Sequence, residues 1–115
     1  MTDPRPAFFN TGDIEQQRAH LGRDYHEFLR VPALSAGLYV LAAGSVDTQR
    51  PHNEDELYYV TRGKARFRAG DNDQPVSPGS LLFVPAKVEH RFFDIAEELV
   101  ALVFFAPAES SGNSD

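Results

Sequence analysis

Two of the four histidines in the chain, His52 and His90, have neighbours that suit a chemical role. His52 lies four residues before Glu56, in a segment rich in acidic residues. On one straight strand these two side chains would lie ~13 Å apart, too far for a single ion to bridge. A bend through residues 53–55, which are of turn-forming types, would fold Glu56 back towards His52. A histidine beside acids is more often part of a solvated loop, so both interpretations stay open.

His90 lies in an alternating segment that places it on the same strand face as Val88 and Phe92. A histidine that faces inward among apolar side chains is either a hydrogen-bonded core residue or a ligand. The other two histidines, His20 and His26, have no comparable pattern around them. We interpret them as surface or structural residues.

The elements that must position these residues are mostly strands. A short helix is expected over residues 14–21, with Asp13 as its N-cap and Gly22 as its stop. Roughly eight short strands follow, and frequent turns between short strands predict an all-β sandwich or barrel. Closure into a barrel would remove exposed sheet edges. The clearest strands cover residues 25–31, 35–42, 57–61, 64–68, 80–84, 89–93 and 99–105.

The length of 115 residues fits one domain. We expect an N-terminal arm over residues 1–11, a barrel domain over residues 12–106 and a disordered tail over residues 107–115. Phe8 and Phe9 could attach the arm to the barrel or to a partner subunit.

The composition excludes several kinds of chemistry. There is no cysteine, which excludes disulfides, thiolate catalysis and sulfur-ligated metals. The net charge of −6 argues against a nucleic-acid partner, and the alternating basic residues between 62 and 68 are typical of a solvated strand face. No apolar run approaches the ~20 residues of a membrane helix, and the N-terminus does not resemble a signal peptide. We therefore expect a cytoplasmic protein without a membrane partner.

The segment around His52 resembles the first sequence motif of the cupin superfamily. That motif runs Gly, a spacer, His-x-His, three or four residues, Glu, six residues and Gly. Gly44, His52, Glu56 and Gly63 fall on it, and both later gaps are respected. The chain departs from the motif at the first histidine, where Arg50 stands. A guanidinium cannot be deprotonated to bind a cation.

The segment around His90 resembles the second cupin motif, which runs Gly, five residues, Pro-x-Gly, two residues, His, three residues and Asn. Gly79, Pro85 and His90 match it in register. Lys87 stands where Gly is usual, and Asp94 stands where Asn is usual. The resemblance implies a double-stranded β-helix, also called a jelly-roll or cupin barrel, with a short N-terminal helix.

The resemblance also implies a metal site on His52, Glu56 and His90. Gln49 could supply a fourth ligand through its amide oxygen if a bulge at Pro51 shifts the strand, or water could complete the site. Two imidazoles and one carboxylate with open positions suit Fe(II), and Mn(II), Zn(II) or Ni(II) are also compatible.

Three further residues are candidates for catalysis. Arg50 either faces the cavity, where it would pair with a substrate carboxylate or phosphate, or points outward at a strand end. Glu54 is a candidate general base if it faces inward. Tyr59, like Tyr39 and Tyr58, either donates a hydrogen bond to a ligand or substrate or is a core aromatic residue.

We expect a small metalloenzyme that acts on an oxygen-rich small molecule, with dioxygenase-like or isomerase-like chemistry. The alternative is a non-catalytic barrel that binds or senses a small molecule, with or without metal. A metal-free barrel with merely structural histidines stays a third possibility. A homodimer is expected for so small a cupin.

Overall fold

The computed structural model describes residues 5–110, which form one helix and six strands. Within this range, no helix has the length and apolar character needed to cross a membrane. The elements are α1 (Thr11–Leu21), β1 (Tyr25–Val31), β2 (Leu34–Leu41), β3 (Asp55–Ala69), β4 (Asn72–Val76), β5 (Leu81–Val84) and β6 (His90–Ala106).

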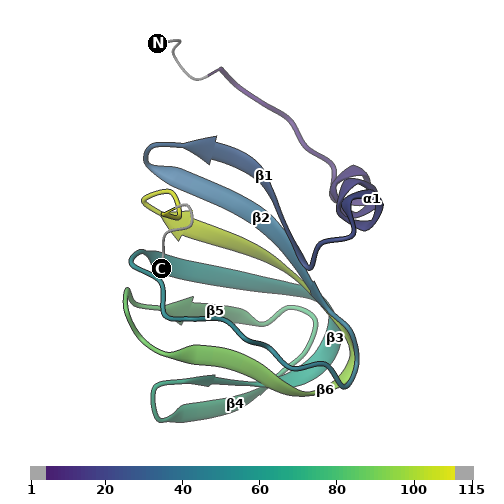
Figure 1. Ribbon diagram of the computed structural model, residues 1–115, viewed down its shortest axis with the longest axis vertical. Helices are drawn as coiled ribbons and strands as arrows, with labels where there is room; N and C mark the ends of the chain where they lie inside the picture. Colours follow the sequence, from purple (N-terminus) through teal and green to yellow (C-terminus); the bar gives the residue numbers. More distant parts are fainter. Residues whose placement is uncertain (1–4, 111–115) are drawn as a thin grey trace.

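The strands pair antiparallel in the order β1-β2-β6-β3-β4, and β5 pairs with β3. β3 and β6 are long partners, in register from Asp55–Ala106 to Ala69–His90. Register shifts between Val60 and Arg66 interrupt this pairing, and such bulges bend a strand and increase its twist. Figure 1 shows the strands curling into a roll, with α1 on the outside near β1 and β2. The all-β double-stranded β-helix expected from the sequence is confirmed.

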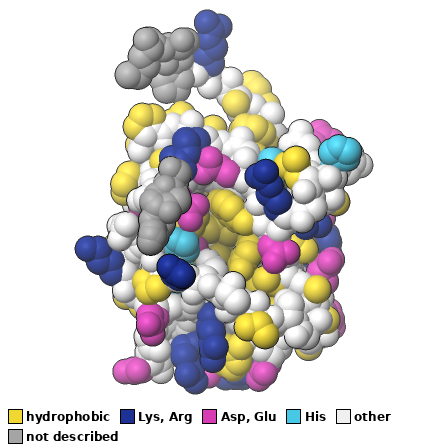
Figure 2. Space-filling model, in the orientation of Figure 1, with side chains coloured by type: hydrophobic (Ala, Val, Ile, Leu, Met, Phe, Trp, Pro, Cys, Tyr) yellow, Lys and Arg dark blue, Asp and Glu magenta, His cyan; other side chains and the backbone are white. Residues whose placement is uncertain are grey.

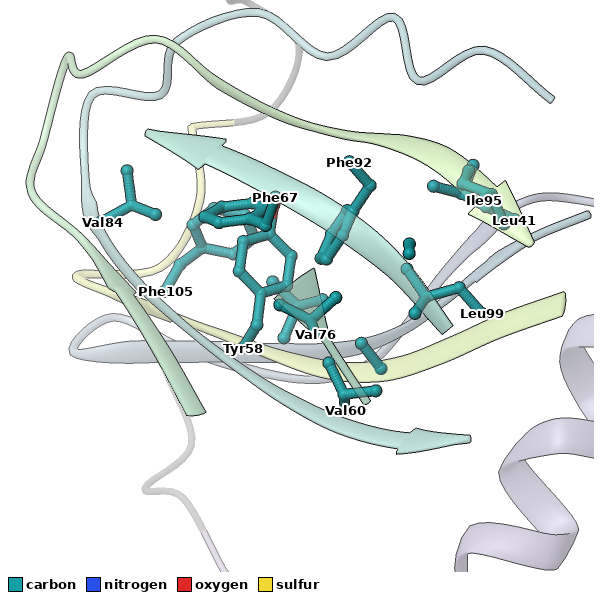
Figure 3. Close-up of a cluster of buried hydrophobic side chains, with 13 residues drawn as sticks. Leu41, Tyr58, Val60, Phe67, Val76, Val84, Phe92, Ile95, Leu99 and Phe105 are labelled. Atoms are coloured by element: carbon teal, nitrogen blue, oxygen red, sulfur yellow. The ribbon is translucent and has the colours of Figure 1, made fainter. Parts of the chain in front are cut away.

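A hydrophobic core fills the roll (Figure 3). Alternation along β3 turns Tyr58, Val60 and Phe67 inward, and Tyr58 is fully buried. The ring of Tyr58 packs edge-on against Phe67 and Phe92, with centroids 5.5 and 5.1 Å apart. Such pairs contribute about 0.5–1.5 kcal/mol each beyond their buried area. This aromatic cluster supports the inner wall on which the polar residues of the site stand.

The helix begins earlier than the sequence predicted. Asn10, not Asp13, is the N-cap, because its extended backbone lets the side chain accept a hydrogen bond from the Gly12 amide at 2.8 Å. Gly22 ends the helix as expected, with a left-handed φ of 70°. In the arm before the helix, Phe9 packs edge-on against Phe28 with centroids 4.9 Å apart. Residues 1–4 of the predicted arm lie outside the described residues.

Two pairs of predicted short strands are in fact single long strands. Residues 57–61 and 64–68 both belong to β3, and the last two predicted strands both belong to β6. Gly63, which lies between the two predicted short strands, is inside β3 and has a φ of 98°. A Cβ atom at this position would lie 2.1 Å from the carbonyl oxygen of Glu98 on β6. The glycine therefore permits a close approach of two strands at a bulge.

Residues 107–110 of the predicted tail, which we call the C-terminal strap, make hydrogen bonds to the strands. The backbone amide of Glu109 donates to the Ser35 hydroxyl at 2.8 Å, and Arg30 donates to the Glu109 carbonyl at 2.6 Å. The strap is thus attached to β1 and β2 by hydrogen bonds. A prediction based on apolar residues does not detect an attachment of this kind. The last five residues of the predicted tail lie outside the described residues.

Candidate metal centre

The structure brings His52, Glu56 and His90 together inside the roll, with one donor atom from each within 4.8 Å of the others. Nε2 of His90 lies 3.0 Å from Oε1 of Glu56, and Nε2 of His52 lies 4.0 Å from the same oxygen. Two ligands held at about 2.1 Å by one ion lie about 3–3.5 Å apart. The spacing therefore fits a single ion after a small closure on the His52 side, where the side chain is 19% exposed.

Backbone conformation delivers these side chains to one place. The chain bends at residues 53–54 and then enters β3, whose alternation turns Glu56 inward. His90 is the first residue of β6. The backbone amide of Lys87 donates to the His52 carbonyl at 2.6 Å and so joins the two loops. Lys87 has a φ of 70°, which explains why cupins usually carry glycine at this position.

Three buried atoms of the cluster have unsatisfied hydrogen-bonding capacity. Both carboxylate oxygens of Glu56 and Nε2 of His90 are without a hydrogen-bond partner within residues 5–110, and Nε2 of His90 lies 3.0 Å from Oε1 of Glu56. Nδ1 of His90 lies 2.9 Å from the Val88 carbonyl, and a proton on Nδ1 leaves the lone pair of Nε2 free. Burying an unpaired carboxylate is costly, and a divalent cation would satisfy all three atoms.

Gln49 presents its oxygen, not its nitrogen, to the cluster. The Nε2 amide of Gln49 donates to Asp47 at 2.9 Å, which leaves Oε1 3.3 Å from Nε2 of His52. The Tyr58 hydroxyl also donates to this oxygen at 3.0 Å. A carbonyl-type oxygen in this position is a suitable fourth donor for a divalent cation.

Asp47 is a functional candidate that the sequence analysis missed. Its carboxylate is buried and accepts hydrogen bonds from the Tyr39 hydroxyl at 2.7 Å and from the Phe92 amide at 2.9 Å, in addition to Gln49. The sequence signal was its place two residues before Gln49, which did not distinguish it from the other acidic residues. Only the fold turns this carboxylate inward.

The C-terminal strap brings a second missed residue to the site. Oε2 of Glu109 lies 3.3 Å from Nδ1 of His52. A carboxylate facing Nδ1 favours the tautomer in which Nε2 is free to bind metal. Burial, together with the negative charges of Glu56 and Glu54, raises the pKa of Glu109 to about 7.

The two histidines respond differently to the same carboxylate. Burial lowers the pKa of His52, and the attraction of Glu56 offsets this only in part. Burial also lowers the pKa of His90, but the closer carboxylate of Glu56 outweighs it, so the pKa of His90 is raised overall. Glu56 therefore attracts positive charge to the Nε2 face of His90.

The three predicted catalytic residues do not share one location. Glu54 is buried on the inward side, where it accepts hydrogen bonds from the amide and the hydroxyl of Ser110 in the strap. Tyr59 faces outward with 39% exposure, because the alternation of β3 turns its neighbour Tyr58 inward. Arg50 is exposed in the loop before β3. The structure thus does not bring Tyr59 or Arg50 to the cluster.

A cavity of about 170 Å³ reaches the cluster from the His52 side. Figure 2 shows a hollow with hydrophobic side chains on this face of the molecule, with a histidine and acidic side chains near its edge. The cavity is lined by Tyr25, Tyr39, Gln49, His52, Val103, Phe105 and Glu109. A small molecule in this cavity would lie beside both His52 and Gln49.

Residues 37–106, more than half of the chain, match the family described as Cupin domain, and the chain belongs to this family. An uncharacterized protein of Streptomyces coelicolor is 43% identical over 102 residues, which cover 89% of this chain and 97% of that protein. Acireductone dioxygenase 4 of Arabidopsis thaliana is 25% identical over 99 residues. This match covers 82% of the chain but only 53% of the plant enzyme.

A solved structure supports the same fold. An RmlC-like cupin family protein with a double-stranded β-helix fold from Methanocaldococcus jannaschii superposes with a TM-score of 0.66 at 18% sequence identity. The superposition covers 72% of this chain and 78% of that chain. The family therefore establishes the architecture, while the chemistry depends on the residues of the site.

Proposed function

We propose that this cupin is a metal-dependent enzyme that acts on a small, oxygen-containing molecule. His52, Glu56 and His90 would hold one divalent ion, with Gln49 as a fourth ligand. The observation that carries this proposal is the buried carboxylate of Glu56, which faces two imidazoles while neither of its oxygens has a hydrogen-bond partner within residues 5–110. This donor set suits Fe(II), Mn(II), Zn(II) or Ni(II).

A bound ion of this kind would supply Lewis-acid polarisation of a substrate oxygen or, in the case of iron, activation of dioxygen. The residues around the ligands keep the donor atoms in position. Asp47 orients Gln49, and Glu109 faces the far nitrogen of His52. The Phe105 ring packs against His52 with centroids 4.8 Å apart and limits access of water to the imidazole.

We propose dioxygenase-like chemistry as the first reaction to test, with isomerase-like chemistry as the alternative. The similarity to acireductone dioxygenase 4 supports this order, although the chain matches only about half of that enzyme. An iron-loaded protein should consume dioxygen in the presence of an acireductone, and its His90→Ala variant should not. Isomerisation of the added compound without oxygen consumption would favour the alternative.

The first experiment is elemental analysis of the purified protein beside its His52→Ala, His90→Ala and His20→Ala variants. We expect near-stoichiometric metal in the wild type and a loss of metal in the first two variants. His20 is exposed on α1 and outside the cluster, so His20→Ala should keep its metal. No bound metal and no uptake on titration would contradict the proposal and favour a metal-free binding barrel. Metal binding without turnover of any ligand would favour a sensing or storage barrel.

We also propose that the protein forms a homodimer through the outer face of β3 and β5. Leu57 and Tyr59 on β3 are paired with Phe83 and Leu81 on β5, and all four side chains are exposed. Adjacent large apolar side chains of this kind are typical of an interaction surface, and a second copy would cover the patch with its own. Sedimentation equilibrium should give twice the mass of one chain, and Phe83→Glu should shift the protein to monomer. A monomeric wild type would contradict this assembly.

A further inference from the structure

We infer that the cavity beside the metal centre recognises a small, uncharged molecule that carries hydroxyl groups, and that Tyr25 and Glu109 select it. This inference rests on the proposed function, because the ligand is expected to meet the metal on the His52 side of the cluster. It specifies a class of substrate that the sequence analysis did not predict, since Arg50 had suggested a carboxylate or phosphate.

The walls of the cavity limit the size and charge of its ligand. Its volume of about 170 Å³ is below the ~300–1,000 Å³ of pockets for drug-sized ligands. Val103 and Phe105 provide an apolar wall, and among the described residues no lysine or arginine lines the cavity. A ligand anion would therefore have no cationic side chain with which to pair.

The surrounding charges disfavour an anion further. Besides Glu109 on the cavity wall, the acidic residues Asp47, Glu54 and Glu56 are buried around the cluster, and these four acids outnumber the two positive charges of a bound divalent ion. The nearby cation, Arg30, is already engaged: its guanidinium donates to both carboxylate oxygens of Glu27 at 3.0 Å. A carboxylate or phosphate entering the cavity would meet this negative field.

Tyr25, which lines the cavity, has a buried hydroxyl group. Its oxygen is buried and has no hydrogen-bond partner within residues 5–110, whereas the neighbouring Tyr39 donates to Asp47. The ring lies against Gly37 of β2, where a Cβ atom would come within 2.3 Å of the hydroxyl oxygen. An unsatisfied buried hydroxyl group is destabilising, and a hydrogen bond to a ligand oxygen in the cavity would satisfy it.

Glu109 contributes an acceptor on the same cavity wall. Its side chain is 26% exposed, so the carboxylate can be reached from the cavity, and Oε2 lies 3.3 Å from the His52 ring. A hydroxyl group both donates and accepts hydrogen bonds, so it can accept from Tyr25 and donate to Glu109. A carboxylate or phosphate only accepts, so it has no hydrogen to donate to Glu109.

The test uses two aromatic probes of similar size, catechol and salicylate, with the zinc-loaded protein in calorimetric titrations. Catechol carries two neutral hydroxyl groups, whereas salicylate carries a carboxylate. We expect catechol to bind at least about tenfold more tightly, which corresponds to about 1.4 kcal/mol. Zinc is redox-inert, so binding is measured without turnover.

Two variants of the cavity test the roles of its residues. Tyr25→Phe should weaken catechol binding about tenfold and leave the zinc affinity unchanged. Gly37→Ala should have the same effect, because its methyl group displaces the Tyr25 ring. Tyr59→Phe is the matched control, since Tyr59 lies on the outer face, and it should change neither affinity. Glu109→Gln should strengthen salicylate binding by removing the repelling charge.

Tighter binding of salicylate than of catechol would overturn the inference, as would Tyr25→Phe and Gly37→Ala variants that bind catechol like the wild type. The zinc titration is measured separately on the same samples. Failure to bind zinc would overturn the proposed metal function and this inference together. Zinc binding with the reversed probe preference would overturn the inference alone.

Discussion

The side-chain amide of Gln49 donates to the carboxylate of Asp47 at 2.9 Å, and this contact turns the amide oxygen towards His52. The nitrogen and oxygen of a glutamine amide are related by a half-turn, so without this contact Gln49 could present its NH₂ group to the cluster. An NH₂ group has no lone pair for a cation. Asp47 therefore determines whether Gln49 can act as a ligand.

Asp47→Asn should lower the affinity for a divalent ion by about 10- to 100-fold, because loss of an outer-shell partner has effects of this size. Competition against a coloured chelator measures the change. Asp94→Asn is the matched control, since Asp94 is exposed and lies outside the cluster. Equal affinities of Asp47→Asn and the wild type would show that Gln49 does not contribute to binding.

Removal of metal should lower the thermal stability of the protein. A ligand that binds only the native state stabilises it by about 2.7 kcal/mol when its free concentration is 100 times its Kd. Calorimetric scans before and after treatment with a chelator should therefore show a clear fall in Tm. The chelator should lower the Tm of the His20→Ala variant as it does in the wild type, and it should leave the Tm of the His90→Ala variant unchanged. A His90→Ala protein that responds to the chelator like the wild type would contradict the assigned ligand set.

Gly63→Ala should destabilise the protein by more than about 3 kcal/mol, because the new methyl group collides with the backbone of β6. Gly79 provides the comparison, since it has a similar φ of 96° but nothing within 4 Å of its Cβ position. Gly79→Ala should cost only the backbone strain, about 1–2 kcal/mol. Denaturant unfolding measures both. Equal losses of stability in the two variants would mean that the close approach of β6 adds no cost at Gly63.

Lys87→Gly should stabilise the protein by up to about 1 kcal/mol. The left-handed conformation costs a residue with a side chain about 1–2 kcal/mol, and the greater entropy of glycine in the unfolded chain offsets part of the gain. Denaturant unfolding at constant metal concentration provides the measurement. A loss of stability would show that the Lys87 side chain makes a favourable contribution of its own.

Asp73 should contribute a pH-dependent part of the stability. Hydrogen bonds from Arg66 and, to a lesser extent, Arg68 lower its pKa in the folded protein. A lowered folded pKa gives stability that is present above the unfolded value of about 3.9 and is lost as the pH falls through the folded value. The Tm difference between wild type and Asp73→Asn should therefore be present at about pH 6 and shrink as the pH falls below about 3.9. A constant difference would contradict this assignment.

The sequence predicted those features that depend on local patterns. Strand character that ends at Pro32 predicted β1 with its observed bounds, and the motif spacing predicted the fold. The bend between His52 and Glu56 was predicted from turn-forming residues and is present. The structure brings together the three predicted ligands, although their metal binding stays a prediction.

Features that depend on contacts between distant segments could not be predicted. The single strand β3 was predicted as two strands, because the approach of β6 to Gly63 does not show in the local sequence. Glu109 belonged to a polar segment with nothing to bury, and hydrogen bonds to Ser35 and from Arg30 attach that segment. Asp47 acquires its role from partners up to 45 residues away.

The pairing of β3 with β6 has a mechanical consequence for the metal centre. Glu56 is paired with Phe105 near one end of this two-stranded ribbon, and His90 is paired with Ala69 at the other end. The two ligands nevertheless lie 3.0 Å apart, because the ribbon curves back on itself. A bound ion would therefore hold the two ends of the curved ribbon together. The affinity for the ion would then depend on how strongly the sheet is curved. Substitutions at the bulges between Val60 and Arg66, which are not ligands, would then change the affinity for the ion.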